Sequence, residues 1–233
     1  MSFRFKHFTV EDNQSTLKIG TDAMLLGAWA NPGNAKRILD IGSGCGVLAL
    51  MMAQKSNALI DAIDIDQLSA DQARENFDKS PWSDRIVSVC CSLDDFRPSS
   101  GDLYDYIISN PPYFSNQLKS KSVRLNRTKH EKGIEVHTLV KKIHSLLRPD
   151  GKFSVIFPYE NHLFFINVCE KNGFHILKQV NVHSKPRSCA GRTLMEFGRT
   201  VNRCPLITQL CILNENGKFT DDYLTMTADF HYF

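Results

Sequence analysis

The chain reads Leu39-Asp40-Ile41-Gly42-Ser43-Gly44-Cys45-Gly46 at the point where a predicted strand over Arg37–Ile41 passes into a predicted helix over Val47–Lys55. A glycine-rich turn between a strand and a helix is typical of an open α/β sheet, in which ligands bind in the crevice at the carboxyl ends of the strands. Glycines let a ligand approach the backbone closely and permit positive φ angles. This stretch therefore predicts both a fold class and a ligand site.

Short strands and helices continue to alternate after this turn. We expect strands over Leu59–Ile65, Ile86–Cys90, Tyr104–Ser109 and Lys152–Phe157, and helices over Gln67–Lys79 and Val136–Leu147, the last followed by the turn Arg148-Pro149-Asp150-Gly151. Such alternation predicts an α/β fold with a doubly wound, mostly parallel, Rossmann-like sheet. Three later strand-like runs with short gaps predict an antiparallel edge at the C-terminal end, over His175–Val182, Thr193–Thr200 and Ile207–Leu213.

The spacing of the glycines distinguishes between cofactors. A dinucleotide fingerprint, Gly-x-Gly-x-x-Gly, needs a glycine where this chain has Val47, which disfavours an NAD-dependent oxidoreductase. The observed Asp-x-Gly-x-Gly-x-Gly resembles the first motif of class I methyltransferases. There the acidic residue orients the amino-acid part of S-adenosylmethionine, usually through water. The resemblance implies that this cofactor binds at Asp40, Gly42, Gly44 and Gly46.

A second acidic residue ends the next predicted strand, in Asp61-Ala62-Ile63-Asp64-Ile65-Asp66. A carboxylate at this place can accept two hydrogen bonds from the hydroxyls of a ribose. Asp66 is an alternative, but Asp64 matches the register of the methyltransferases better. We therefore expect Asp64, with Ile65 beside it, to bind the cofactor ribose.

The contact to the cofactor adenine is less clearly marked. Methyltransferases of this type commonly place an acidic residue there after the third strand, whereas this chain reads Cys90-Cys91-Ser92-Leu93-Asp94-Asp95, with Ser92 at the expected place. Either Ser92, together with Leu93, or Asp94 makes the contact.

Asn110-Pro111-Pro112-Tyr113 follows the fourth predicted strand and so falls at the same edge of the sheet. An aromatic amino group is a poor nucleophile because its lone pair is delocalised into the ring. The Asn110 side-chain oxygen and the Pro111 carbonyl can each accept one amino hydrogen and localise that pair. The two prolines restrict the backbone, and Tyr113 offers a face on which a base can stack.

A longer pattern narrows the family. Ahead of the glycines stands Lys18-Ile19-Gly20-Thr21-Asp22-Ala23-Met24-Leu25-Leu26-Gly27-Ala28-Trp29. Together with Asn110-Pro111-Pro112-Tyr113 it resembles the bacterial tRNA(Val) (adenine(37)-N6)-methyltransferase family, and the likeness covers nearly the whole chain. The resemblance implies a tRNA substrate methylated in its anticodon loop, and a cofactor pocket that Thr21 and Asp22 help to close. We expect one domain over residues 1–233, with a lid and substrate segment over 1–36 and the core over 37–233.

Positive charge is concentrated in two segments. Residues 119–132 and 178–203 hold twelve cations against two glutamates, a net charge of +10, whereas the whole chain carries only +3. A basic face attracts a polyanion such as RNA. The expected phosphate-binding residues are Lys119, Lys121, Arg124, Arg127, Lys129, Lys185, Arg187 and Arg192.

Composition excludes several other classes of protein. Seven cysteines without a Cys-x-x-Cys pair match neither a disulfide framework nor a zinc site, so we expect a cytoplasmic protein without a metal. We also expect a monomer. The chain contains no run of about 18 apolar residues, so we expect no membrane span. Two alternatives remain open: an amino methyltransferase acting on guanine N2 of ribosomal RNA or on a protein glutamine, and an RNA-binding relative without catalysis.

Overall fold

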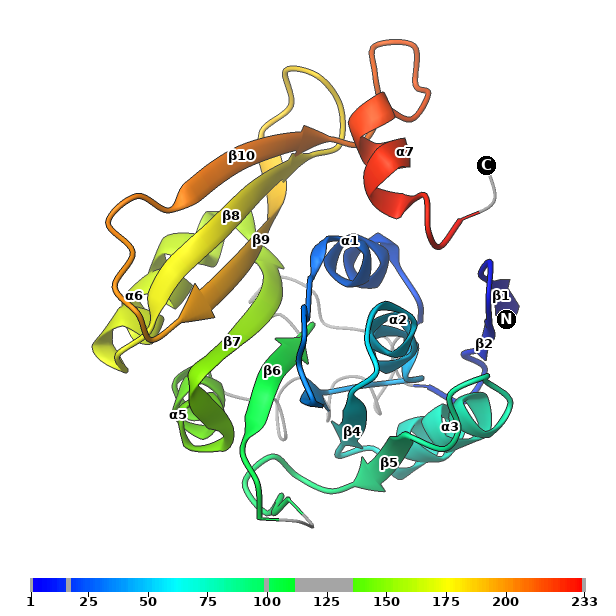
Figure 1. Ribbon diagram of the computed structural model, residues 1–233. Helices are drawn as coiled ribbons and strands as arrows, with labels where there is room; N and C mark the ends of the chain where they lie inside the picture. Colours follow the sequence, from blue (N-terminus) through cyan, green and yellow to red (C-terminus); the bar gives the residue numbers. More distant parts are fainter. Residues whose placement is uncertain (1, 16–17, 99–100, 112–135, 232–233) are drawn as a thin grey trace.

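An eight-stranded sheet with helices on both faces forms the centre of the computed structural model, which describes residues 2–15, 18–98, 101–111 and 136–231 (Figure 1). In spatial order the strands are β10-β8-β9-β7-β6-β3-β4-β5. Their bounds are β3 Arg37–Ile41, β4 Leu59–Asp64, β5 Ile86–Cys90, β6 Tyr104–Ser109, β7 Leu147–Pro158, β8 His175–His183, β9 Ala190–Gly198 and β10 Leu206–Cys211. The α/β, mostly parallel sheet predicted from the sequence is confirmed.

The described helices divide between two hydrophobic cores, one on each face of the sheet. Helices α1 (Thr21–Trp29), α2 (Val47–Lys55), α3 (Gln67–Asp78) and α7 (Asp221–Thr227) contribute to one core, and α5 (Val136–Leu146) and α6 (His162–Lys171) to the other. Figure 1 shows α1 and α2 on one side of the curved sheet and α5 and α6 on the other, with α7 beside α1. Helices α1, α6 and α7 were not anticipated from the alternation of strands and helices.

The parallel register brings the carboxyl ends of the central strands to one edge. Ile41 of β3 pairs with Ile63 of β4 and with Ser109 of β6, and Asp64 pairs with Cys90 of β5. The residues that follow these strands therefore lie next to one another, and we call this the carboxyl edge. It is the edge at which the glycine turn and the Asn110 motif were expected to meet.

The C-terminal strands confirm the antiparallel edge only in part. Strand β9 is antiparallel to both β7 and β8, as expected. The outermost strand, β10, instead runs parallel to β8, so antiparallel pairing is wrong for this strand. The reason is that β7 and β8 already occupy both sides of β9. The chain must cross back to the free side of β8 before it can pair again.

The turn expected at residues 148–151 lies inside β7. Pairing with β6 steps from Tyr104↔Leu147 to Tyr106↔Lys152, so the intervening residues leave the ladder as an irregularity. Proline cannot donate a ladder hydrogen bond, which explains why the pairing fails at Pro149. Arg148 holds the irregularity to β6, since its Nε lies 3.3 Å from Asp105 Oδ1.

Segments before β3 and after β10 close one side of the sheet. Strands β1 (Ser2–Arg4) and β2 (Thr9–Glu11) form a separate antiparallel pair. The amide of Lys6 donates to Phe230 O at 3.1 Å, and Gln54 Nε2 donates to Asp229 O at 2.9 Å. The two ends of the described chain thus meet beside α2 (Figure 1). Over the described residues, none of the helices has the length and apolar character needed to cross a membrane.

Candidate active site

The glycine turn has the conformation that its sequence predicts. Gly42, Gly44 and Gly46 have φ angles of 73°, 56° and 83°, a region that favours glycine. The amides of Gly42 and Ser43 donate to Ile63 O at 2.9 and 3.0 Å, which fixes the turn against β4. A Cβ at Gly42 would have no described atom within 4 Å, whereas one at Gly46 would overlap the ring of Phe77. With respect to the described residues, the turn thus faces open space at Gly42 and is closely packed at Gly46.

Asp40 presents a buried carboxylate beneath this turn. Its side chain is fully buried, and Oδ2 accepts a hydrogen bond from the Ala49 amide at 3.1 Å. Oδ1 has no hydrogen-bond partner among the described residues. Burial, with a smaller contribution from the charge of Asp64, raises the pKa of Asp40 to about 7. An ionised Asp40 therefore requires, at Oδ1, a cation or a further hydrogen-bond donor beyond those that the described residues supply.

Asp64 is held at the end of β4 by two backbone amides. Oδ2 accepts from Gly44 N at 2.8 Å and Oδ1 accepts from Asp66 N at 2.9 Å. Each oxygen keeps a further lone pair, so the carboxylate can still accept from two hydroxyls. Burial raises the pKa of Asp64 as well. Ile65 follows it and is exposed.

The alternative, Asp66, has a structural role. It is the N-cap of α3, and its Oδ2 accepts from Ser69 N at 3.0 Å and from Ser69 Oγ at 2.7 Å. A capping carboxylate of this kind satisfies an amide that the helix leaves unpaired. The ribose contact therefore stays a prediction for Asp64 rather than for Asp66.

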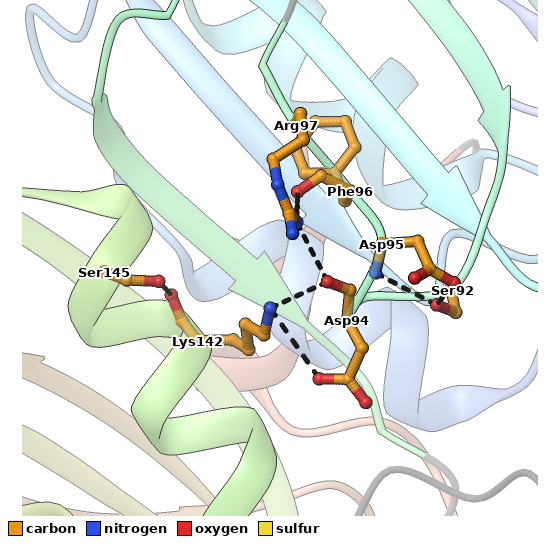
Figure 2. Close-up of polar contacts among 7 residues, drawn as sticks. All are labelled: Ser92, Asp94, Asp95, Phe96, Arg97, Lys142 and Ser145. Atoms are coloured by element: carbon orange, nitrogen blue, oxygen red, sulfur yellow. Dashed lines mark hydrogen bonds and ion pairs between the residues drawn. The ribbon is translucent and has the colours of Figure 1, made fainter.

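Figure 2 shows the loop after β5, where the adenine contact was expected. Ser92 Oγ donates to Asp95 Oδ2 at 2.6 Å and accepts from Asp95 N at 3.1 Å, so it closes a tight turn. The carbonyl of Asp94 accepts from Lys142 Nζ of α5 at 2.8 Å, and its carboxylate lies 3.8 Å from the same ammonium group. Leu93 is buried in the second core. Both Ser92 and Asp94 are thus engaged within the protein, and the two alternatives stay open.

Asn110 lies one residue beyond Ser109, which pairs with Ile41 immediately before the glycine turn. Ser109 Oγ donates to Ile41 O at 2.8 Å and ties the ends of the two strands together. Neighbouring strands are about 4.8 Å apart, so the structure brings Asn110 beside Gly42. Pro111 is buried. Pro112 and Tyr113 lie outside the described residues.

Helix α1 brings Thr21 and Asp22 toward the same edge. Thr21 is the first helical residue after the N-cap Gly20 and is exposed. Asp22 Oδ2 accepts a hydrogen bond from Arg192 Nε of β9 at 2.8 Å. A residue expected at the cofactor pocket and one expected on the RNA surface therefore form an ion pair. No local pattern in the sequence could have revealed it, because 170 positions separate them.

Asn76 is a site residue that sequence reasoning missed. From α3, its Nδ2 donates to Glu11 O and to Cys45 O, both at 2.8 Å, and its Oδ1 accepts from Glu11 N at 2.9 Å. One amide thereby joins the N-terminal segment to the glycine turn. A Cβ at Gly44 would lie 3.4 Å from Ser15 Oγ, so the segment after Glu11 also lies against this turn.

The basic residues expected to bind RNA have different positions. Lys185 and Arg187 lie on the exposed turn between β8 and β9, where Arg187 has a φ of 60°. Arg187 Nη2 lies 3.6 Å from Glu215 Oε1. Two further cations of residues 178–203 have partners at the opposite edge: Lys178 lies 3.7 Å from Glu196, and Arg199 donates to Leu147 O at 2.9 Å. Outside the described residues lie Lys119, Lys121, Arg124, Arg127 and Lys129.

Known proteins with similar sequences are methyltransferases. Residues 13–178 match the family model "Methyltransferase small domain". The "tRNA1(Val) (adenine(37)-N6)-methyltransferase" of Phocaeicola vulgatus is 39% identical over 229 residues, covering 98% of this chain and 97% of that protein. The protein of the same name from Pectobacterium carotovorum is 36% identical, covering 99% of this chain and 94% of its own length.

Solved structures show the same fold. A predicted O-methyltransferase from Agrobacterium tumefaciens superimposes with a TM-score of 0.68 at 20% identity, covering 90% of this chain and 96% of that chain. The 16S rRNA N2 G1207 methyltransferase of T. Thermophilus, solved in complex with AdoMet and guanosine, gives 0.59 at 16% identity, covering 86% of this chain and 50% of that chain. At these identities the likeness concerns the fold alone.

Proposed function

The chain belongs to the methyltransferase small domain family and, within it, to the tRNA1(Val) (adenine(37)-N6)-methyltransferases, and from this premise we propose that it methylates N6 of adenine 37 in tRNA1(Val) with S-adenosylmethionine. One observation carries the proposal: Asn110, at the end of β6, lies beside the glycine turn at the end of β3. An acceptor for amino hydrogens thus stands next to the cofactor-binding motif.

The residues of the turn suit S-adenosylmethionine. The unpaired Oδ1 of Asp40 is matched to the cationic amino group of the cofactor, directly or through water. The carboxylate of Asp64, already held by two amides, accepts from the ribose hydroxyls. When bound, S-adenosylmethionine supplies a methyl group on a positively charged sulfur, ready for in-line attack.

Asn110 and Pro111 prepare the nitrogen that attacks. The amide oxygen of Asn110 and the carbonyl of Pro111 each accept one hydrogen of the adenine amino group, so that the nitrogen can become pyramidal. Both acceptors are held by the strand before them, so they need not be reoriented during the reaction. No strong base is required, because the methylated nitrogen becomes acidic and loses its proton to solvent.

Lys185 and Arg187 support an RNA substrate. They lie on the exposed β8–β9 turn, and cations there neutralise phosphates without choosing a base. An unpaired base of an anticodon loop costs little to extrude, which suits a site that acts on a single adenine. All seven cysteines are free, which suits a reducing compartment, and we propose that the protein acts in the cytoplasm and as a monomer.

The test is methylation of defined transcripts. Purified protein, labelled S-adenosylmethionine and a tRNA1(Val) transcript should give N6-methyladenosine, identified by nucleoside analysis. A transcript with guanine at position 37 is the matched control and should give no product. Label in N2-methylguanosine, or equal label in the control transcript, would overturn the proposal.

A further inference from the structure

The turn after β7 carries two stacked aromatic rings that the proposed reaction does not use. Tyr159, in the short helix η2 (Tyr159–Asn161), stacks on His162 at the start of α6, with ring centroids 4.4 Å apart and planes 19° from parallel. His162 Nδ1 is hydrogen-bonded to Tyr159 O. A carbonyl can only accept, so Nδ1 donates and the imidazole is held in place. Both rings are partly exposed.

The neighbouring surface is apolar as well. Leu163 and Phe164, the next two residues of α6, are 70% and 53% exposed. Phe164 contacts His137 of α5 edge to face, with centroids 5.9 Å apart. Helix α5 begins one residue before His137, so the starts of both helices contribute rings to this surface.

This aromatic turn projects beyond the reaction motif on the adjacent strand. Val155 of β7 pairs with Ser109 of β6. Counted from this pair, Tyr159 is four residues further along its strand direction, whereas Asn110 is one residue further. At about 3.3 Å per residue, Tyr159 lies at most about 10 Å further out than Asn110. Tyr159 is thus near enough to Asn110 to contact the RNA strand next to the target base.

Cations lie at the same edge of the sheet as the aromatic turn. Arg192 pairs with Pro158, the residue before Tyr159, and is bound to Asp22 of α1. Lys185 and Arg187 are on the turn that precedes β9. Glu160 is exposed within the aromatic turn, so the turn itself is no phosphate site. Aromatic faces in a turn that itself carries an exposed carboxylate, with cations at the same edge of the sheet, suit the ring of a base better than its phosphate.

We propose that Tyr159 and His162 form a second base-binding site, on which an unpaired RNA base next to the target adenine stacks. The inference rests on the proposed function for the nature of the substrate. Stacking holds the RNA strand on one side of the target while Asn110 engages the amino group. A base stacks on an aromatic ring whatever its sequence, so this site positions the target and does not select it.

A fluorescent base tests the proposal directly. RNA hairpins with the anticodon stem and loop carry 2-aminopurine at the nucleotide before or after the target, and its fluorescence is quenched when it stacks. The intact protein should quench one of the two positions. Tyr159→Ala should abolish that quenching and weaken RNA binding by about 5- to 100-fold. Tyr159→Phe, which keeps the ring, should restore both.

Three further measurements separate stacking from other roles. The salt dependence of RNA binding should be unchanged in Tyr159→Ala, since every cation that faces a phosphate is still present. S-adenosylmethionine affinity should be unchanged too. Leu206→Ala removes a side chain that is 59% exposed at the start of β10, at the other edge of the sheet, and should leave quenching as it is. His162→Ala should also reduce quenching. It replaces Tyr159→Ala as the test variant if circular dichroism shows that Tyr159→Ala does not fold.

Equal quenching and RNA affinity in Tyr159→Ala and the intact protein would overturn the second site. A parallel loss of S-adenosylmethionine affinity would also overturn it, because the turn would then only support the fold. Methyl transfer is scored separately on the intact protein. An intact protein that methylates adenine but stacks no flanking base contradicts this inference alone, whereas stacking without methylation contradicts the proposed reaction.

Discussion

At the scale of single residues, Asp64 and Asp66 can be compared directly, because they are two positions apart: Asp64 ends β4 and Asp66 caps α3. Asp64→Ala should weaken S-adenosylmethionine binding by about 1–3 kcal/mol, because two hydroxyls lose their acceptor. Asp66→Ala removes a helix cap and should lower the free energy of unfolding by about 1 kcal/mol while cofactor binding stays the same. Calorimetric titration and denaturant unfolding of both variants decide between them, and the reverse pattern would move the ribose contact to Asp66.

Asp40 predicts a pH dependence of cofactor binding. Its pKa of about 7 in the fold exceeds the ordinary value of 3.8, so the folded protein without cofactor takes up a proton as pH falls through 7. That protonation stabilises the fold below pH 4, and the stabilisation is lost as pH rises through 7. A cationic ligand needs the ionised carboxylate. Its affinity should therefore fall about tenfold for each pH unit below 7.

The measurement is titration of S-adenosylmethionine between pH 5.5 and 7.5, below the range of about 7.7–8.0 in which an α-amino group loses its own proton. Asp40→Asn is the control, since an amide cannot titrate, and its weaker binding should be independent of pH. A slope shared by both proteins would assign the effect to another group.

Asn110 is the residue on which the chemistry depends most. Asn110→Ala should retain its fold and its cofactor affinity but lose about 100-fold or more in methyl transfer, because an acceptor that acts in the transition state is deleted. Single-turnover assays with saturating tRNA measure this step alone. Near-normal turnover would contradict the proposed mechanism.

At the scale of elements, the Asp22–Arg192 pair fixes α1 to β9. Arg192→Ala should loosen the start of α1 and weaken cofactor binding by about 1 kcal/mol, because the pair is only partly exposed. Asp22→Asn tests the same ion pair from the other side. In a double-mutant cycle the two effects should not add. Full additivity would show that the two side chains act independently, and Arg192 would then be available to RNA as first expected.

The elements also show what the sequence could predict. The strand Arg37–Ile41 and the helix Val47–Lys55 agree with the observed bounds, because an apolar run, a glycine turn and a second apolar run all mark the same junction. Short helices such as α7 carry a weaker signal. Its N-cap Thr220, whose side chain accepts from Tyr223 N, is clear only once the helix is known. The parallel pairing of β10 depends on β8 having a free side, and no local sequence pattern indicates which strand has one.

Some residues of the candidate site could be predicted from the sequence and others could not. Glycines and carboxylates that follow strands were predictable, since the topology alone brings strand ends to one edge. Contacts such as Asn76 with Glu11 and Cys45 were not, because they join segments 65 and 31 positions apart through a single side chain. An asparagine within a helical run gives no sign of such a role.

At the scale of the whole molecule, the basic segments predict how RNA affinity responds to salt. Replacing Arg124, Arg127 and Lys129 with alanine should weaken tRNA binding and flatten its salt dependence by about 0.7–0.9 log units for each phosphate that the protein no longer neutralises. S-adenosylmethionine affinity should stay the same, and the product that still forms should be N6-methyladenosine at the same position. Titration with tRNA1(Val) at several salt concentrations measures the slope. Identical slopes would mean that these cations are solvated and touch no phosphate.

Gly46 has a consequence for how such proteins are recognised across genomes. A Cβ at this position would collide with Phe77, so the last glycine of the motif is imposed by the packing of α3. A descendant that had lost its enzymatic activity would still be obliged to keep that glycine for as long as it kept the ring. Retention of Gly46 therefore reflects the packing of α3 and is not by itself evidence of catalysis. The buried Oδ1 of Asp40 is the more informative trait, because it has no hydrogen-bond partner among the described residues, and a buried carboxylate oxygen left without a partner lowers stability.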